Sequence, residues 1–206
     1  MAVWSQYVVV VFETRSTEYR DAVIDLLAKI VSNTKATEPG ALKYCVAVPR
    51  DPSDDRKIYC IEEYASQAAN DIHMASAPVQ ALFKYLSETP TALAGAPTVM
   101  TMSPLAAFTR PEIASYNDPA ISFIELGSGK DVDMIAVAAQ QVAIESRGDP
   151  RLLCTAALRD INKPVVRLFR VGRKGDGSEE SDGSNVPLRA VSGYLWKDTA
   201  QEQQLW

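Results

Sequence analysis

The same order of strands and helices is predicted twice along this 206-residue chain, and this repeat constrains the fold more than any single motif does. In the first half, short β-branched runs predict strands, and apolar residues at helical spacing predict helices. Glu38-Pro39-Gly40 breaks the first helix and turns the chain. The expected strands are at 7–13, 41–48, 57–64 and 99–102, and the expected helices are at 17–33, 66–72 and 76–88.

The second half repeats this plan at an offset of roughly 110 residues, which is long enough for a duplicated domain. Gly148-Asp149-Pro150 takes the place of the earlier Glu-Pro-Gly turn, and Arg159-Asp160 echoes Arg50-Asp51 between two apolar runs. We therefore expect two domains, 1–104 and 105–206. The expected elements of the second are strands at 120–126, 164–171 and 188–196 and a helix at 131–147.

The two halves differ after their third strand. The first half continues into a helical segment that contains His73, the only histidine of the chain. The second half continues into 172–186, which is rich in Gly, Ser, Asp and Glu and predicts an acidic, solvated loop. We therefore expect a small-molecule site in the first half, and a degenerate copy without a site of its own in the second.

Composition excludes several classes of function. Apolar residues make up 47% of the chain, which is enough for a sizeable core. The formal net charge of -5 argues against nucleic acid and against anionic membrane surfaces as partners. No apolar stretch reaches the length of a membrane span, and the N-terminus has no signal-peptide pattern. Three widely spaced cysteines lack zinc or redox spacing, so we expect buried, reduced thiols in a cytoplasmic protein.

A set of motifs in the first half resembles a known family. In chain order, the motifs are the Glu38-Pro39-Gly40 turn, Tyr44, Glu62, Tyr64, His73 and Ser76. Residues 7–102, which carry this set, resemble the antibiotic biosynthesis monooxygenase domain of the dimeric α+β barrel superfamily. The resemblance implies an α+β fold with two ferredoxin-like lobes whose antiparallel sheets face each other. Most relatives use two chains for this, so we expect either a pseudo-dimeric monomer or a homodimer.

The resemblance also implies a range of reactions. Many relatives oxidise aromatic polyketide phenols or anthrones with molecular oxygen, without flavin or metal, while others catalyse decarboxylation, isomerisation or cyclisation. The favoured hypothesis is a cofactor-independent monooxygenase of secondary metabolism that takes a small hydrophobic aromatic substrate and O2. No cofactor and no metal site are expected. The alternatives are a non-oxidative cyclase, isomerase or decarboxylase, and a protein that only binds a hydrophobic metabolite.

Three residues are the expected catalytic group. His73 can take a phenolic or enolic proton because imidazole titrates near neutrality, although a helix-end histidine can also simply bond to backbone. Glu62 and Tyr64 are two apart on a strand and so share one sheet face. If that face lines the barrel, Glu62 could orient His73, and Tyr64 could donate a hydrogen bond to a developing oxyanion.

Four further residues are candidates for contact with the substrate. Cys60 shares the sheet face of Glu62 and Tyr64, and Tyr7 lies on the first strand. Asn33 could hold a substrate oxygen or O2, but at a helix end it could equally be a C-cap. Trp196 could stack on an aromatic ring or pack at an edge of the core.

Overall fold

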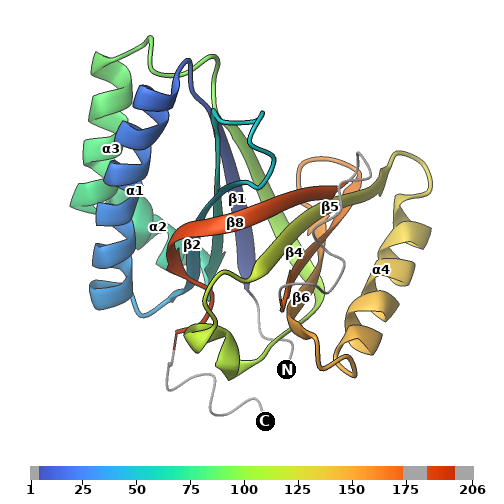
Figure 1. The fold of residues 1–206 in the computed structure, drawn as a ribbon. Helices are drawn as coiled ribbons and strands as arrows, with labels where there is room; N and C mark the ends of the chain where they lie inside the picture. Colours follow the sequence, from blue (N-terminus) through green and yellow to red (C-terminus); the bar gives the residue numbers. More distant parts are fainter. Residues whose placement is uncertain (1–4, 174–184, 198–206) are drawn as a thin grey trace. The chain divides into compact units, whose positions relative to one another are not determined.

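The computed structural model of the protein describes residues 5–173 and 185–197, and it has the α+β fold that the sequence predicts (Figure 1). The strands are β1 Gln6–Glu13, β2 Ala41–Pro49, β3 Lys57–Tyr64, β4 Thr98–Thr109, β5 Ala120–Ser128, β6 Leu152–Asp160, β7 Val165–Gly172 and β8 Asn185–Tyr194. The helices are α1 Thr17–Thr37, α2 Gln67–Ala75, α3 Ala77–Glu88 and α4 Val132–Ser146, with a 3-10 helix η1 at Pro111–Ser115.

The described residues fall into two compact units. The first unit contains 5–47, 55–99 and 191–197, and the second contains 48–54, 100–173 and 185–190. Strands β2, β4 and β8 therefore contribute residues to both units. The sequence boundary at 104 falls inside β4. That the two sheets face each other stays a prediction.

In the first unit, β3 lies between β1 and β2 in an antiparallel sheet, and α1, α2 and α3 lie on one face of it (Figure 1). The N-terminus of α1 is capped by Ser16, whose side chain accepts a hydrogen bond from the Tyr19 N–H at 3.3 Å. A buried apolar core fills the space between the sheet and the helices, and each large side chain in it contributes about 1.5–3 kcal/mol. Its members include Phe12, Val23, Leu27, Ile30, Tyr44, Val46, Ile58, Cys60, Val79 and Leu82.

In the second unit, the antiparallel strand order is β4–β6–β7–β5–β8, and α4 covers one face of the sheet. The helix approaches the sheet through the small side chains of Ala136, Ala139 and Ala143. They pack on Ala157 and Leu168. Among its described residues, the second unit thus has one α-helix on the sheet, where the first unit has three.

Three strands of each unit pair in the same way, namely β1, β3 and β2 in the first unit and β5, β7 and β6 in the second. Val8, Glu62 and Tyr44 form one row across β1, β3 and β2. The corresponding row across β5, β7 and β6 is Ser122, Arg170 and Thr155. Each sheet also has a register shift next to this row. The shift lies between residues 41 and 43 in β2 and between residues 152 and 154 in β6. This matched irregularity supports the duplication that the sequence predicts.

The sequence misjudged several element bounds, and the two largest errors are the ends of α1 and β4. The first helix continues to Thr37 instead of ending at 33. Pro39 disfavours a helical conformation for the residue before it, so the helix ends just before Glu38. Strand β4 extends to Thr109 instead of ending at 102. Pro104 made a long strand improbable, but a register shift between Pro104 and Ala106 accommodates it.

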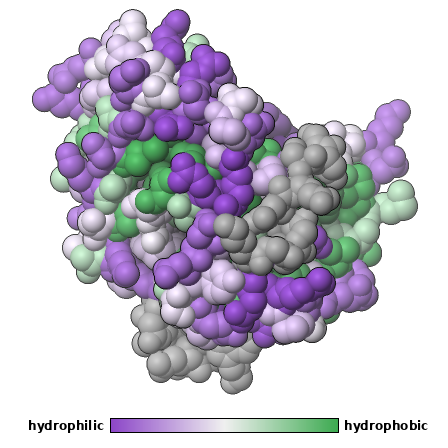
Figure 2. Space-filling model, in the orientation of Figure 1, coloured by the Kyte–Doolittle hydropathy of each residue, from purple (hydrophilic) through white to green (hydrophobic). Residues whose placement is uncertain are grey.

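The outward side of α4 is also apolar. Met134, Val137 and Ile144 are 69%, 68% and 54% exposed, and they lie opposite the alanine stripe that meets the sheet. Figure 2 shows this apolar colour on the α4 side of the molecule. None of the helices in the described part of the chain is long and apolar enough to cross a membrane.

Candidate functional site

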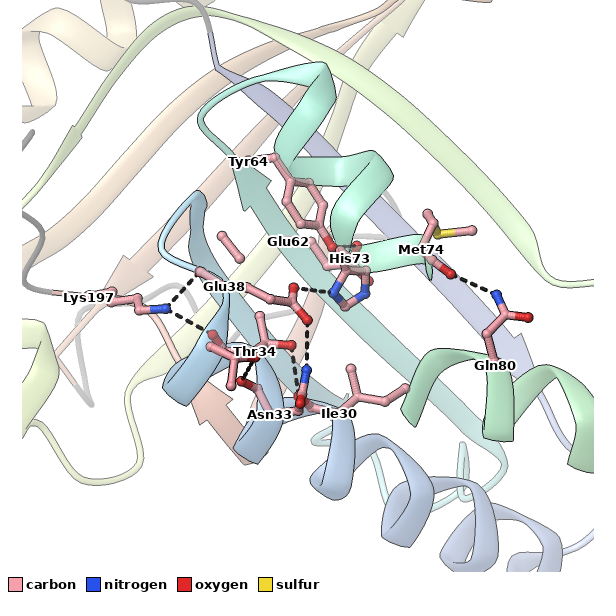
Figure 3. Close-up of polar contacts among 12 residues, drawn as sticks. Ile30, Asn33, Thr34, Glu38, Glu62, Tyr64, His73, Met74, Gln80 and Lys197 are labelled. Carbon is pink, nitrogen blue, oxygen red and sulfur yellow. Dashed lines mark hydrogen bonds and ion pairs between the residues drawn. The ribbon is translucent and has the colours of Figure 1, made fainter. Parts of the chain in front are cut away.

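His73 is the buried side chain of α2, with 3% of its surface exposed. The helix begins at Ser66, whose hydroxyl accepts a hydrogen bond from the Ala69 N–H at 3.1 Å. His73 lies in the last turn and points toward the sheet and the end of α1 (Figure 3). The imidazole is therefore buried within the first unit.

A carboxylate from another element fixes the imidazole. Nδ1 of His73 lies 2.9 Å from Oε2 of Glu38, and both side chains are 4% exposed. The other carboxylate oxygen, Oε1, accepts a hydrogen bond from the Asn33 amide at 2.9 Å (Figure 3). Because a carboxylate accepts, Nδ1 carries the hydrogen and Nε2 is the basic nitrogen of the neutral ring.

Glu38 is itself held at the C-terminal end of α1, as the C-cap residue. The Lys197 ammonium donates to the backbone oxygens of Thr34 and Glu38, at 2.9 and 2.8 Å. A carboxylate at this end of a helix is opposed by the helix dipole, and the nearby lysine offsets this repulsion. Burial lowers the pKa of Lys197, while the charge of Glu38 acts in the opposite direction.

A second polar pair lies beside the histidine. Tyr64 donates its hydroxyl hydrogen to Oε2 of Glu62 at 2.8 Å, and both residues are buried. The rings of Tyr44 and Tyr64 lie 5.2 and 5.4 Å from the imidazole, measured between centroids. The imidazole therefore has two phenol rings beside it, with a carboxylate held at its Nδ1 and a second carboxylate nearby.

Burial shifts the acid–base behaviour of this group. It raises the pKa of Glu62, although the nearby His73 and the Tyr64 hydrogen bond act in the opposite direction. Burial also raises the pKa of Tyr64 and of Tyr44, and the Glu62 charge adds to both shifts. The two phenols therefore stay protonated and can serve as hydrogen-bond donors at neutral pH.

The sequence predicted His73, Glu62 and Tyr64 as one group, and the structure brings them together. It corrects two details. The partner of the imidazole is Glu38, whereas Glu62 bonds to Tyr64. The sheet face that these strand residues share with Cys60 packs against the helices and does not line the inside of a barrel. The site therefore lies between the sheet and the helices of the first unit.

The four predicted substrate contacts are placed differently. Cys60 is buried on the site's sheet face, two residues before Glu62. Asn33 lies inside α1 and is not its C-cap, and its amide is engaged with Glu38. Tyr7 lies on the opposite sheet face, where the Lys43 ammonium is 5.7 Å from its ring centroid. Trp196 is half-buried after β8. Substrate contact by these residues stays a prediction.

Glu38 is the residue that sequence reasoning missed as a functional group. It was read only as part of a helix-breaking turn. An acidic residue at a helix C-terminus is unfavourable unless something compensates for it, and this was the available signal. In the described part of the chain, no three His, Cys, Asp or Glu side chains are arranged to hold a metal ion.

The first half of the chain is similar to a known protein family. Residues 6–85 match the model of the antibiotic biosynthesis monooxygenase family. The comparison with curated proteins gave no match.

Solved structures of similar length share the fold. A proposed monooxygenase from Fusobacterium nucleatum superposes with a TM-score of 0.76 at 14% identity, covering 94% of this chain and 95% of its own. A proposed monooxygenase from Lactobacillus acidophilus gives 0.66 at 16% identity, covering 91% and 93%. An anthrone oxidase-like protein gives 0.61 at 14% identity, covering 95% and 96%. These likenesses show the fold.

The resemblance predicted from the sequence is therefore confirmed: residues 6–85, which supply the histidine, both glutamates and the two tyrosines of the site, match the antibiotic biosynthesis monooxygenase family.

Proposed function

We propose that the first unit is a cofactor-independent monooxygenase that oxidises an electron-rich phenol or anthrone of the aromatic polyketide type. The observation that carries this proposal is the hydrogen-bonded chain Asn33–Glu38–His73, in which Glu38 and His73 are buried and Nε2 is left as the basic atom. A base held in this way can take an acidic C–H or O–H proton from an aromatic substrate. The three cysteines are buried thiols, in keeping with the reducing cytoplasm that the proposal assumes.

The reaction balances without an added reductant. His73 takes one proton from the anthrone methylene, and the resulting carbanion transfers one electron to O2. Recombination of the two radicals forms a carbon–oxygen bond, and the peroxide takes back the proton. Loss of water then breaks the O–O bond and gives the quinone. One anthrone and one O2 therefore yield one quinone and one water, and the substrate supplies the electrons.

The protein residues around the imidazole have separate tasks in this scheme. Glu38 keeps the ring in one tautomer and stabilises the imidazolium that forms when the proton is taken. The phenol groups of Tyr64 and Tyr44 remain protonated. The Tyr64 hydroxyl donates to Glu62 in the free protein, and it would stabilise the developing enolate oxygen by exchanging this bond for one to the substrate. Binding positions the substrate and excludes water from the reactive carbanion.

The test is oxygen consumption by the purified full chain with an anthrone, followed with an oxygen electrode. Replacing His73 by Gln removes the base but keeps a polar side chain, and we expect the rate to fall at least about a hundredfold. Met74→Leu is the matched control, because Met74 is the next residue on α2 and is 45% exposed. This control should keep the rate of the unmodified protein.

The same assay separates the alternative functions. Near-normal oxygen uptake by His73→Gln would remove the histidine from the mechanism. Product formation from polyketide substrates under nitrogen would instead identify a cyclase, isomerase or decarboxylase that uses the same acid–base group. Saturable binding of the anthrone with no product in either atmosphere would identify a binding protein.

A further inference from the structure

A second polar group lies on the helix-covered sheet face of the second unit. Ser122, Arg170 and Thr155 are direct neighbours across β5, β7 and β6. In each strand, the residue two positions away on the same face (Ile124, Leu168 or Ala157) packs against α4. The three polar residues therefore continue the face that α4 covers.

Two of these side chains are buried without a partner. Ser122 and Thr155 are both 0% exposed, and within residues 5–173 and 185–197 neither hydroxyl oxygen has a hydrogen-bond partner. A buried hydroxyl that forms no hydrogen bond costs about 1–3 kcal/mol. Two of them on the strands that flank Arg170 are better explained by a missing ligand than by chance.

The position of this row in the repeat is informative. In strand order and in pairing register, it corresponds to the row Val8, Glu62 and Tyr44 of the first unit. Arg170 therefore stands where the first unit has the buried acid Glu62. The sequence predicted that the second copy had lost its site, but the duplicated position still carries polar side chains, with the opposite charge.

The surroundings favour a negatively charged ligand with an apolar body. Phe108 of β4 pairs directly with Thr155, and the Arg110 guanidinium lies 5.5 Å from the centroid of the Phe108 ring. Arg110 donates to the backbone oxygens of Leu152 and Arg147, at 2.9 and 2.6 Å. Arg170 is half-buried, so part of this residue faces solvent.

We infer that the second unit holds its own binding site for a small aromatic carboxylate. The carboxylate lies at Arg170 and accepts hydrogen bonds from the hydroxyls of Ser122 and Thr155, and the apolar part of the ligand lies toward Phe108. The site requires the positive charge of the guanidinium and the two unsatisfied hydroxyls. It does not require the monooxygenase activity of the first unit.

Calorimetric titration of the full chain with sodium benzoate tests this site. We expect saturable binding by the unmodified protein and none with benzamide, which has the same ring but no charge. Thr155→Val and Arg170→Gln should each weaken benzoate binding at least about tenfold, because each removes a charge-assisted contact. Ser103→Ala, an exposed change on β4, is the matched control and should bind benzoate like the unmodified protein.

His73→Gln separates this site from the one in the first unit. Benzoate binding that persists in His73→Gln supports a separate site, whether or not the chain oxidises anthrones. Equal binding by Thr155→Val, Arg170→Gln and the unmodified protein would overturn the inference, as would loss of binding in His73→Gln. If a variant fails to fold, methyl NMR of the unmodified chain decides: benzoate should shift the Thr155 methyl signal, and an unmoved signal contradicts the site.

Discussion

At the scale of single residues, the carboxylate of Glu38 controls the imidazole. Glu38→Gln keeps the size of the side chain but removes its charge, so the imidazolium loses its stabilisation and the tautomer is no longer enforced. We expect kcat for anthrone oxidation to fall roughly tenfold or more, with KM little changed, because Glu38 acts through His73. Steady-state kinetics would measure kcat and KM separately. Glu88→Gln, an exposed change on α3, should leave both constants unchanged.

A second residue-scale prediction concerns stability and pH. Burial raises the pKa of Glu62 in the folded protein above its ordinary value of 4.5. The folded state therefore keeps this proton longer than the unfolded state, and ionising Glu62 destabilises the fold as pH rises above about 4.5. Glu62→Gln stays neutral, so its stability relative to the unmodified protein should increase between pH 4 and pH 7.

Urea unfolding at several pH values measures this difference. At pH 4 both proteins carry a neutral side chain at position 62, and their unfolding free energies should be similar. At pH 7 the variant should be the more stable one. A variant that is less stable at pH 7 would mean that the charge of Glu62 is more favourable to the fold than its burial is costly.

The sequence predicted the histidine group because His73, Glu62 and Tyr64 each belong to a chemically informative residue type. It could not find Glu38 in that group, because the contact joins the end of α1 to α2 across 35 positions of the chain. Local spacing carries no information about such a contact. The face of β3 was predicted correctly from its two-residue period, but whether helices or another sheet cover that face depends on tertiary packing.

At the scale of elements, α2 carries the histidine and depends on its cap. Ser66→Ala removes the hydrogen bond to the Ala69 N–H, which should cost about 1 kcal/mol. Because α2 has nine residues and little buried surface of its own, this loss should increase local opening of the helix. Hydrogen exchange should become faster for α2 amides.

Ser16→Ala is the matched control, because Ser16 caps α1 in the same way. Ser16→Ala should lower global stability by a similar amount, since α1 is longer and packs along the core. It should not make hydrogen exchange selectively faster for the α2 amides. Selective fast exchange of α2 in both variants would show that the helix opens for a reason other than its cap.

The element boundaries show where local pattern fails. The span Lys57–Tyr64 was predicted to the residue, because a β-branched and aromatic run lies between polar neighbours. Strand β4 was predicted far too short, because a proline within it normally argues against a strand. Its pairing with β6 comes from residues about fifty positions later and supplies the hydrogen bonds around the bulge.

At the scale of the whole molecule, three buried thiols report on unfolding. Cys45 and Cys60 belong to the first unit and Cys154 to the second, and burial raises the pKa of Cys45 to about 12. Iodoacetamide at pH 8 should therefore leave all three unmodified in the native protein. Since β2, β4 and β8 contribute to both units, we expect the thiols to react in one urea transition, as followed by mass spectrometry of the labelled peptides.

Labelling of Cys154 at a lower urea concentration than Cys45 and Cys60 would contradict this. It would show that the second unit opens while the first remains folded. The sequence predicted two separate halves and could not show these shared strands, because a hydrophobic pattern identifies a strand but not the strand beside it.

Lys197 connects the C-terminal part of the described chain to the histidine site. Its ammonium is bonded to the backbone of the residue whose side chain holds the histidine, although 159 positions separate them in sequence. An exopeptidase that removed this lysine would take one hydrogen bond from each of the Thr34 and Glu38 carbonyls, which would keep the backbone N–H groups of Glu38 and Ala41. It would also remove a positive charge that lies near the Glu38 carboxylate. Trimming of the C-terminus could thus alter the basicity of a site that lies in the first half of the chain.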